Sequence, residues 1–270
     1  MIDLHCHILP GIDDGPPEEH DSLALARALV AGGCQIVAAT PHLRDDHPGV
    51  RVEELAERCD ALNGALAAAS IALQVVPAAE VDMLWAHAAS DEQLGLASYG
   101  QLGADILLET PYGPLPAAFE GVVGALQARG LRVLLGHPER NPTFQRDPER
   151  LSGLVNAGVL VQVTAQSLVD PGRRSASHEL AVALVKQELA HVIASDSHSA
   201  GRFRPPNLAA GVLAAAGIAP RRAAWMAVDA PLAILAGKPL RPPSPNGSPP
   251  PAGRGRWPAL RALPRFGSEQ

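Results

Sequence analysis

Short apolar runs alternate with longer Ala- and Leu-rich segments along most of the chain. The short runs have the length and composition of buried strands, while the longer ones repeat apolar residues at helical spacing. We expect seven strands, at residues 1–5, 35–40, 73–79, 105–108, 131–135, 159–163 and 191–194. We expect helices at residues 18–31, 52–69, 116–129, 148–157, 177–189 and 221–236.

This alternation is typical of βα units with a parallel sheet. Parallel strands need crossover connections, and either a closed barrel or an open doubly wound sheet would satisfy the pattern. The choice between the two therefore depends on the polar residues that follow the strands.

Six of the seven expected strands are followed by residues that can bind a metal. In His5-Cys6-His7 and Asp196-Ser197-His198 the outer residues are two apart, so both side chains of each pair should face one side. The full candidate set is His5, His7, Asp14, His42, Glu80, Glu109, His137, Asp196 and His198. These residues converge only if the sheet closes, because all βα loops of a barrel share its C-terminal rim. The sequence thus predicts an α/β fold, a seven-stranded (β/α)7 barrel with a metal site at that rim.

The candidate ligands are imidazoles and carboxylates without thiolate, a set that suits Mn, Fe or Zn. Nine ligands exceed what one ion takes, so two or three ions are expected. Clustered divalent ions activate a water and hold a phosphoryl group for in-line attack. Arg140 and Arg204 follow candidate ligands and could bind phosphate oxygens, since guanidinium groups match them bidentately. Arg202 competes with Arg204 for this role.

Composition and charge narrow the alternatives. The 270 residues are 47% hydrophobic, enough for one folded domain, expected at 1–237. Residues 238–270 form a Pro-, Gly- and Arg-rich tail, expected to be disordered, with six basic residues and one acidic one. The total net charge is −6, so the domain carries −11, which disfavours nucleic acid as a partner. The apolar stretches are too short for membrane insertion, and a cytoplasmic location is expected.

Other hydrolytic mechanisms lack their motifs. The three cysteines, Cys6, Cys34 and Cys59, form no paired framework, as expected in a reducing compartment. A cysteine-based phosphatase has an arginine at the sixth position after its cysteine, and none of the three has one. The chain has no G-x-x-x-x-G-K loop and no G-x-S-x-G elbow, so neither P-loop nor serine chemistry is indicated.

Several motifs together resemble the PHP (polymerase and histidinol phosphatase) superfamily. More narrowly, they resemble the bacterial manganese-dependent protein-tyrosine phosphatases of capsule and exopolysaccharide regulation. The motifs are His5-x-His7, Asp13-Asp14-Gly15-Pro16, Thr40-Pro41-His42, Glu80, Glu109, His137-Pro138-Glu139-Arg140, Asp196-x-His198 and Arg204-Pro205-Pro206. Two departures stand out: Ser199 replaces a frequent Asn, and residues 199–203 are one residue longer than usual.

The resemblance implies a distorted seven-stranded (β/α)7 barrel of the PHP type. It also implies three Mn²⁺ ions with defined ligands, and Arg140 and Arg204 holding the phosphate. One ion would take His5, His7, Glu80 and Asp196; Glu80 would bridge to a second with Glu109 and His137; Asp14, His42 and His198 would bind the third. The implied substrate is phosphotyrosine on a protein, the tyrosine-rich tail of a bacterial tyrosine autokinase. A metal-bound hydroxide would attack without a covalent intermediate.

Three alternatives stay open at this point. The first is a small-molecule phosphomonoesterase such as histidinol phosphatase, with the same chemistry and another pocket. The second is a metal-dependent amidohydrolase, although such barrels usually carry a modified lysine where this chain has Glu109. The third is a binding module without catalysis, which would tend to lack ligands.

Overall fold

The computed structural model describes residues 1–169, 175–201 and 204–243. Most of the predicted tail, residues 244–270, and Arg202 lie outside the described residues. Within them, nine strands form two parallel sheets, with strand orders β1-β2-β4 and β3-β5-β6-β7-β8-β9. The strands are β1 (Ile2–Cys6), β2 (Ile36–Ala39), β3 (His42–Leu43), β4 (Gln74–Pro77), β5 (Glu80–Val81), β6 (Asp105–Glu109), β7 (Arg132–Gly136), β8 (Leu160–Thr164) and β9 (Val192–Ala194).

The expected single sheet of seven strands is not confirmed, because two of the predicted strands are each followed by a further short strand in the other sheet. The run 35–40 contains β2, and β3 begins beyond Pro41; the run 73–79 contains β4, which ends at Pro77, and β5 begins at Glu80. Proline has no backbone N–H to donate and interrupts a ladder of hydrogen bonds. The two sheets meet again where β1 contacts β9, through a parallel bridge between Cys6 and Ser197.

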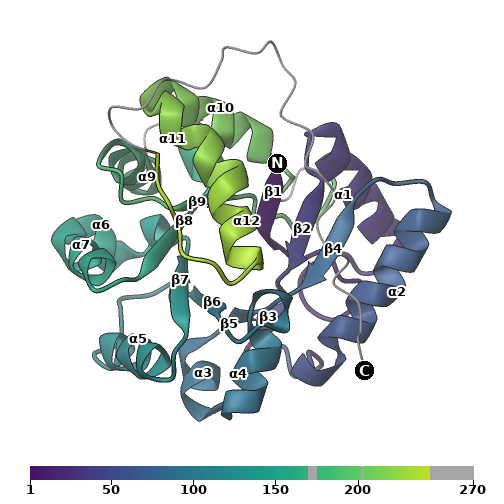
Figure 1. The fold of residues 1–270 in the computed structure, drawn as a ribbon, viewed down its shortest axis with the longest axis horizontal. Coiled ribbons are helices and arrows are strands. Elements are labelled where there is room, and N and C mark those ends of the chain that lie inside the picture. The colour runs from purple at the N-terminus through teal and green to yellow at the C-terminus, as the bar shows by residue number, and fades with distance from the viewer. Residues whose placement is uncertain (170–174, 202–203, 244–270) are drawn as a thin grey trace.

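Most helices lie around the outside of the strands, whereas the last helix, α12 (Ala230–Leu235), lies across the middle of the ring that the strands form in this view (Figure 1). The other helices are α1 (Glu19–Ala31), α2 (Leu55–Ala68), α3 (Met83–Ala88), α4 (Asp91–Ala97), α5 (Phe119–Ala128), α6 (Pro142–Arg146), α7 (Pro148–Asn156), α8 (Ala165–Leu168), α9 (Ala176–Lys186), α10 (Leu208–Ile218) and α11 (Pro220–Ala224). Single turns add η1 (Val52–Glu54), η2 (Tyr99–Gln101) and η3 (Pro138–Arg140), and a π-helical segment, η4 (Trp225–Asp229), joins α11 to α12. Among the described residues, none of the helices combines the length and the apolar character that crossing a bilayer requires.

The apolar core has two layers, and alternate strand residues belong to each. The larger cluster packs the strands against the surrounding helices. The smaller one collects strand residues from both sheets and is completed by Tyr99 and two residues of α12, Ile234 and Leu235. Its strand members are Ile2, Leu4, Ile36, Ala38, Val76, Leu107, Leu134, Leu160, Val192 and Ala194, and Ala78, just after β4, joins them. Glu109, a candidate ligand, stands two residues beyond Leu107 of this inner cluster in β6, so the strand period points both side chains to the same side.

A bulge in β1 sets the direction of the first two histidines. Asp3 pairs with Val37 and Cys6 with Ala39, so β1 holds one residue more than β2 between the same two pairings. An extra residue reverses which side the following side chains face. Cys6 consequently joins the outer cluster, while the flanking His5 and His7 face the ligand cluster.

Candidate metal centre

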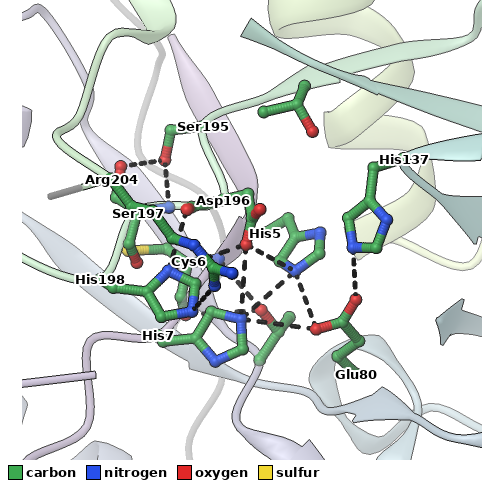
Figure 2. Close-up of polar contacts among 12 residues, drawn as sticks. His5, Cys6, His7, Glu80, His137, Ser195, Asp196, Ser197, His198 and Arg204 are labelled. Carbon is green, nitrogen blue, oxygen red and sulfur yellow. Dashed lines mark hydrogen bonds and ion pairs between the residues drawn. The ribbon is translucent and has the colours of Figure 1, made fainter. Parts of the chain in front are cut away.

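The nine predicted ligands come together at the end of the strands where their C-termini lie. Figure 2 shows His5, His7, Glu80, His137, Asp196 and His198 directed toward one another. The nine candidate ligands form four overlapping groups, and within each group the ligand atoms lie within 4.8 Å of one another. The groups are His7, Asp14, His42 and His198; His5, His7 and Asp196; His5, Glu80 and His137; and His42, Glu80 and Glu109. The convergence predicted from the strand ends is therefore present.

Glu80 is the centre of this arrangement. Its Oε2 lies 3.2 Å from His5 Nε2, 3.4 Å from His7 Nε2 and 3.1 Å from His42 Nδ1, and its Oε1 lies 2.9 Å from His137 Nε2. Burial alone would raise the pKa of Glu80, but the surrounding imidazoles hold it well below its usual range. The carboxylate is thus negatively charged and bordered by four imidazoles, as a bridging metal ligand would be.

Two buried atoms at the centre lack hydrogen-bond partners. Glu80 Oε2 and His42 Nδ1 lie 3.1 Å apart, yet neither makes a hydrogen bond. Buried polar atoms are nearly always satisfied, and a lone pair facing a carboxylate is costly unless a cation lies between them. The donors are imidazole nitrogens and carboxylate oxygens, the set that Mn, Fe and Zn accept. The residues present therefore fit a divalent metal centre.

The position of Glu109 beside Glu80 also indicates a cation site. Burial and the negative charge of Glu80 raise the pKa of Glu109 to about 8, because a second buried carboxylate beside Glu80 would be repelled by it. A shared cation would remove that repulsion. The Arg44 guanidinium offsets part of it, since its Nη1 donates to Glu109 Oε1 at 2.8 Å. Sequence reasoning missed Arg44, because nothing in the run of residues links it to a carboxylate 65 positions away.

A more open group gathers around Asp14, whose side chain is 40% exposed. Asp14 Oδ1 lies 3.1 Å from His198 Nε2 and 3.5 Å from His42 Nε2. Burial, together with the neighbouring His7, lowers the pKa of His42 to about 3. His42 is consequently neutral at physiological pH and keeps a lone pair available for a metal.

Two further polar residues orient the imidazoles. Asp13 Oδ2 accepts from His7 Nδ1 at 2.7 Å and from the His42 backbone N–H at 3.2 Å. Gln162 Oε1 accepts from His5 Nδ1 at 3.0 Å and from the His137 backbone N–H at 3.2 Å. Such partners direct the opposite ring nitrogen toward a metal. Gln162 lies on β8, the strand without a predicted ligand, and its signal was an amide in the apolar run 159–163.

The two predicted phosphate-binding arginines line one cavity of about 300 Å³ next to the ligands. Arg140 Nη1 donates to Asp196 Oδ2 at 2.6 Å. Arg204 Nη1 lies 2.6 Å from His198 Nε2 and 3.5 Å from Asp14 Oδ2. The cavity is lined by Arg140, Gln166, Ser195, Asp196, Arg204, Pro205 and Asn207. Both guanidinium groups thus stand where an anion bound beside the metal site would meet them.

Three of the six non-glycine residues with positive φ in the described part of the chain lie at this site. His137, Asp196 and Arg204 have φ values of 36°, 53° and 43°, in the left-handed region that non-glycine residues rarely adopt. Strained residues persist where the surrounding structure holds them, and they cluster at functional sites. Two candidate ligands and one candidate phosphate contact share this feature.

The cysteines take no part in the centre as nucleophiles. Cys6, Cys34 and Cys59 are free and buried. Burial raises the pKa of Cys34 and of Cys59 to about 12 and raises that of Cys6 well above its usual value. None is a thiolate at neutral pH, the form that attacks phosphate.

Known proteins are similar to this chain in sequence and in fold. Tyrosine-protein phosphatase YwqE of Bacillus subtilis (strain 168) is 35% identical over 207 residues, covering 74% of this chain and 78% of that protein. Tyrosine-protein phosphatase CpsB of Streptococcus pneumoniae is 23% identical over 217 residues, covering 76% and 86%.

The solved structures agree. This chain resembles a crystal structure from the set of YwqE from Bacillus subtilis and CpsB from Streptococcus pneumoniae, which are described as unique metal-dependent tyrosine phosphatases. The TM-score is 0.79 and the identity 28%, over 92% of this chain and all of the other. A lactonase from Listeria monocytogenes shares the fold, with a TM-score of 0.55 and 13% identity over 88% of this chain and 95% of the other.

The family model described as "Capsular polysaccharide synthesis, CpsB/CapC" matches residues 1–218. That span contains all nine candidate ligands and both arginines. The narrower resemblance drawn from the motifs is confirmed: this chain belongs to the CpsB/CapC family of capsular polysaccharide synthesis proteins.

Proposed function

We propose that this chain is a metal-dependent protein-tyrosine phosphatase acting in capsule or exopolysaccharide synthesis. The observation that carries the proposal is the joint placement of nine imidazole and carboxylate ligands beside a cavity lined by two arginines. Its family, and relatives named tyrosine-protein phosphatases, support the same activity. The substrate is phosphotyrosine on a protein, for which we propose the tail of a bacterial tyrosine autokinase.

The proposed cofactor is Mn²⁺, two or three ions per chain. Asp14, His42 and His198 fall in one geometric group, which supports the proposed third ion. His5, His7 and Asp196 fall in another, and Glu80 Oε2 lies 3.2 Å from His5 Nε2 and 3.4 Å from His7 Nε2, which supports the first. Glu80 groups with His137 and, separately, with Glu109, which suits a bridging carboxylate. When bound, the ions supply an activated water and neutralise charge on the phosphoryl oxygens.

The chain's own residues hold and orient the substrate. Arg140 and Arg204 bind the phosphoryl oxygens through paired N–H donors, and they stabilise the charge that builds up during transfer. Arg140 Nη1 donates to Asp196 Oδ2 at 2.6 Å, so the guanidinium is positioned before substrate arrives. Asp13 and Gln162 hold the imidazoles in the orientation that metal binding needs. Cysteine does not take part.

We further propose a single domain over residues 1–237, a distorted barrel of the PHP type closed through the contact between β1 and β9, and a cytoplasmic location. Inner-cluster residues contributed by strands of both sheets support the barrel. The bridge between Cys6 and Ser197, with Asp196 N–H donating to the His5 carbonyl at 2.8 Å, supports its closure.

Substrate choice tests the proposal. With Mn²⁺ present, kcat/KM for a phosphotyrosine peptide should clearly exceed that for histidinol phosphate, the best small-molecule alternative. Arg140→Ala should lower kcat/KM on the peptide by about 10²–10³-fold, the usual cost of losing a charge-stabilising donor. Arg129→Ala, at an exposed arginine paired with Asp91, is the matched control and should leave kcat/KM unchanged. A preference for histidinol phosphate would overturn the assignment.

A further inference from the structure

An exposed tyrosine borders the candidate site. Among the described residues four large apolar side chains are exposed, and Tyr112 is the aromatic one, with 55% of its surface accessible. Tyr112 lies three residues beyond Glu109, in the loop that follows β6. Exposing an aromatic ring costs solvation free energy, so a ring held at the rim of a site invites a functional explanation.

The ring of Tyr112 connects the ligand cluster with the phosphate-binding side of the site. Its centroid lies 6.3 Å from that of the His137 imidazole, with the two planes 26° apart. Its hydroxyl accepts a hydrogen bond from Arg204 Nη2 at 3.3 Å. One side chain thus contacts both a candidate ligand and a candidate phosphate-binding residue.

The backbone on both sides of Tyr112 is fixed. Asn141 Nδ2 donates to the Pro111 carbonyl at 2.7 Å and to the Gly113 carbonyl at 2.9 Å. Asn141 is 1% exposed and directly follows Arg140. The same buried amide therefore couples the loop that carries the tyrosine to the segment that carries a phosphate-binding arginine, and the ring projects from a held backbone.

We propose that Tyr112 is a specificity-determining residue that packs against the aryl ring of the substrate. The inference rests on the proposed function. Arg204 lines the cavity and also contacts the Tyr112 hydroxyl, so a group esterified to a phosphate held by Arg140 and Arg204 can reach the Tyr112 ring. Aromatic rings stack favourably at centroid separations of about 4.5–7 Å, an interaction that an alkyl ester such as phosphoserine cannot make.

Binding of phosphonates tests this separately from catalysis. In the Mn²⁺-loaded protein, calorimetry should show tighter binding of phenylphosphonate than of methylphosphonate. Tyr112→Ala should reduce that ratio of affinities by about 3- to 10-fold, the range expected for losing one aromatic pair. Tyr112→Phe keeps the ring without the hydroxyl and should retain the ratio. Leu102→Ala, at another exposed apolar side chain, is the control and should retain it as well.

The outcomes separate this inference from the proposed function. If Tyr112→Ala weakens both phosphonates equally, or if the wild type binds them equally, the tyrosine does not read the aryl group and the inference fails, even where phosphotyrosine peptide is hydrolysed. If the ratio falls as expected in a protein that hydrolyses no phosphotyrosine, aryl recognition stands and the proposed phosphatase activity fails.

Discussion

Single hydrogen bonds decide which nitrogen each buried imidazole offers to a metal. Asp13 engages His7 through Nδ1, and the opposite nitrogen, Nε2, then faces Glu80 at 3.4 Å. Gln162 engages His5 in the same way, leaving Nε2 3.2 Å from Glu80. Both rings thereby direct the same nitrogen inward, which is the geometry that a shared cation requires.

Replacing Asp13 by Asn should weaken metal binding without removing a ligand. Asn keeps the shape of the side chain but loses the negative charge that favours the correct form of His7. Loss of such an orienting partner typically lowers metal affinity by about 10–100-fold. Titration of the metal-free protein with Mn²⁺ measures the effect, and Asp60→Asn at an exposed site is the matched control. Equal affinity in both variants would show that Asp13 does not orient His7.

His191 should make the protein sensitive to acid. Its Nδ1 accepts from the Val161 backbone N–H at 3.1 Å, and burial together with Arg222 lowers the pKa of His191 to about 4. The unfolded side chain binds a proton near pH 6.5, so the stabilisation is complete above that pH and is lost as the pH falls toward 4. The loss is roughly 2–3 kcal/mol.

Urea denaturation between pH 7 and pH 4 measures that loss. His191→Asn keeps an acceptor but cannot titrate, so its free energy of unfolding should fall less steeply over this range than that of the wild type. Parallel curves for the two proteins would show that His191 contributes no pH dependence.

At the level of elements, local irregularities place the site. The bulge in β1 turns His5 and His7 inward, and Pro41 separates β2 from the short β3 that begins at His42. Near the C-terminal end of the described region, η4 widens the helix just before Pro231, which can donate no hydrogen bond to Ala227 and would crowd its carbonyl. The break after β2 and the widened helix each have a proline as their local cause, whereas the bulge in β1 depends on the pairing with β2.

Helix α10 packs closely on α8, and Gly211 makes that contact possible. A Cβ at Gly211 would lie 2.5 Å from the Cβ of Ala165 and 2.6 Å from its Cα. Gly211→Ala should therefore destabilise the protein by about 1–3 kcal/mol, as overpacking does. Gly217→Ala in the same helix meets no atom within 4 Å and should be neutral or slightly stabilising. Thermal unfolding measures both, and equal melting temperatures would contradict the packing argument.

The sequence predicts the elements unevenly. The strands were found because β-branched apolar runs end in polar residues, and the ligands were found for the same reason. Helix α10 was missed, since Leu208–Ile218 is apolar on nearly every side and shows no helical period. The bulge in β1 was also missed, because only pairing with β2 reveals the extra residue.

Across the whole molecule, the fold brings together residues from its two ends. Asp196 N–H donates to the His5 carbonyl at 2.8 Å, and His7 N–H donates to the Ser197 carbonyl at 2.9 Å. Ligands almost 200 positions apart thereby share one set of candidate ions. Contacts between residues far apart in the sequence are not visible in the local pattern. Nothing beside Arg44 points to Glu109, and the amide of Gln162 stands out in its apolar run without indicating His5 as its partner, which explains why the ligands were predicted and their partners were not.

The most direct test of the account is hydrolysis of a phosphotyrosine peptide by protein whose metal content is measured alongside. We expect two or three Mn²⁺ ions per chain in the active protein, loss of activity when a chelator removes them, and recovery when Mn²⁺ is returned. Full activity in protein shown to hold no divalent metal would contradict the claim that the nine converging side chains act through shared cations.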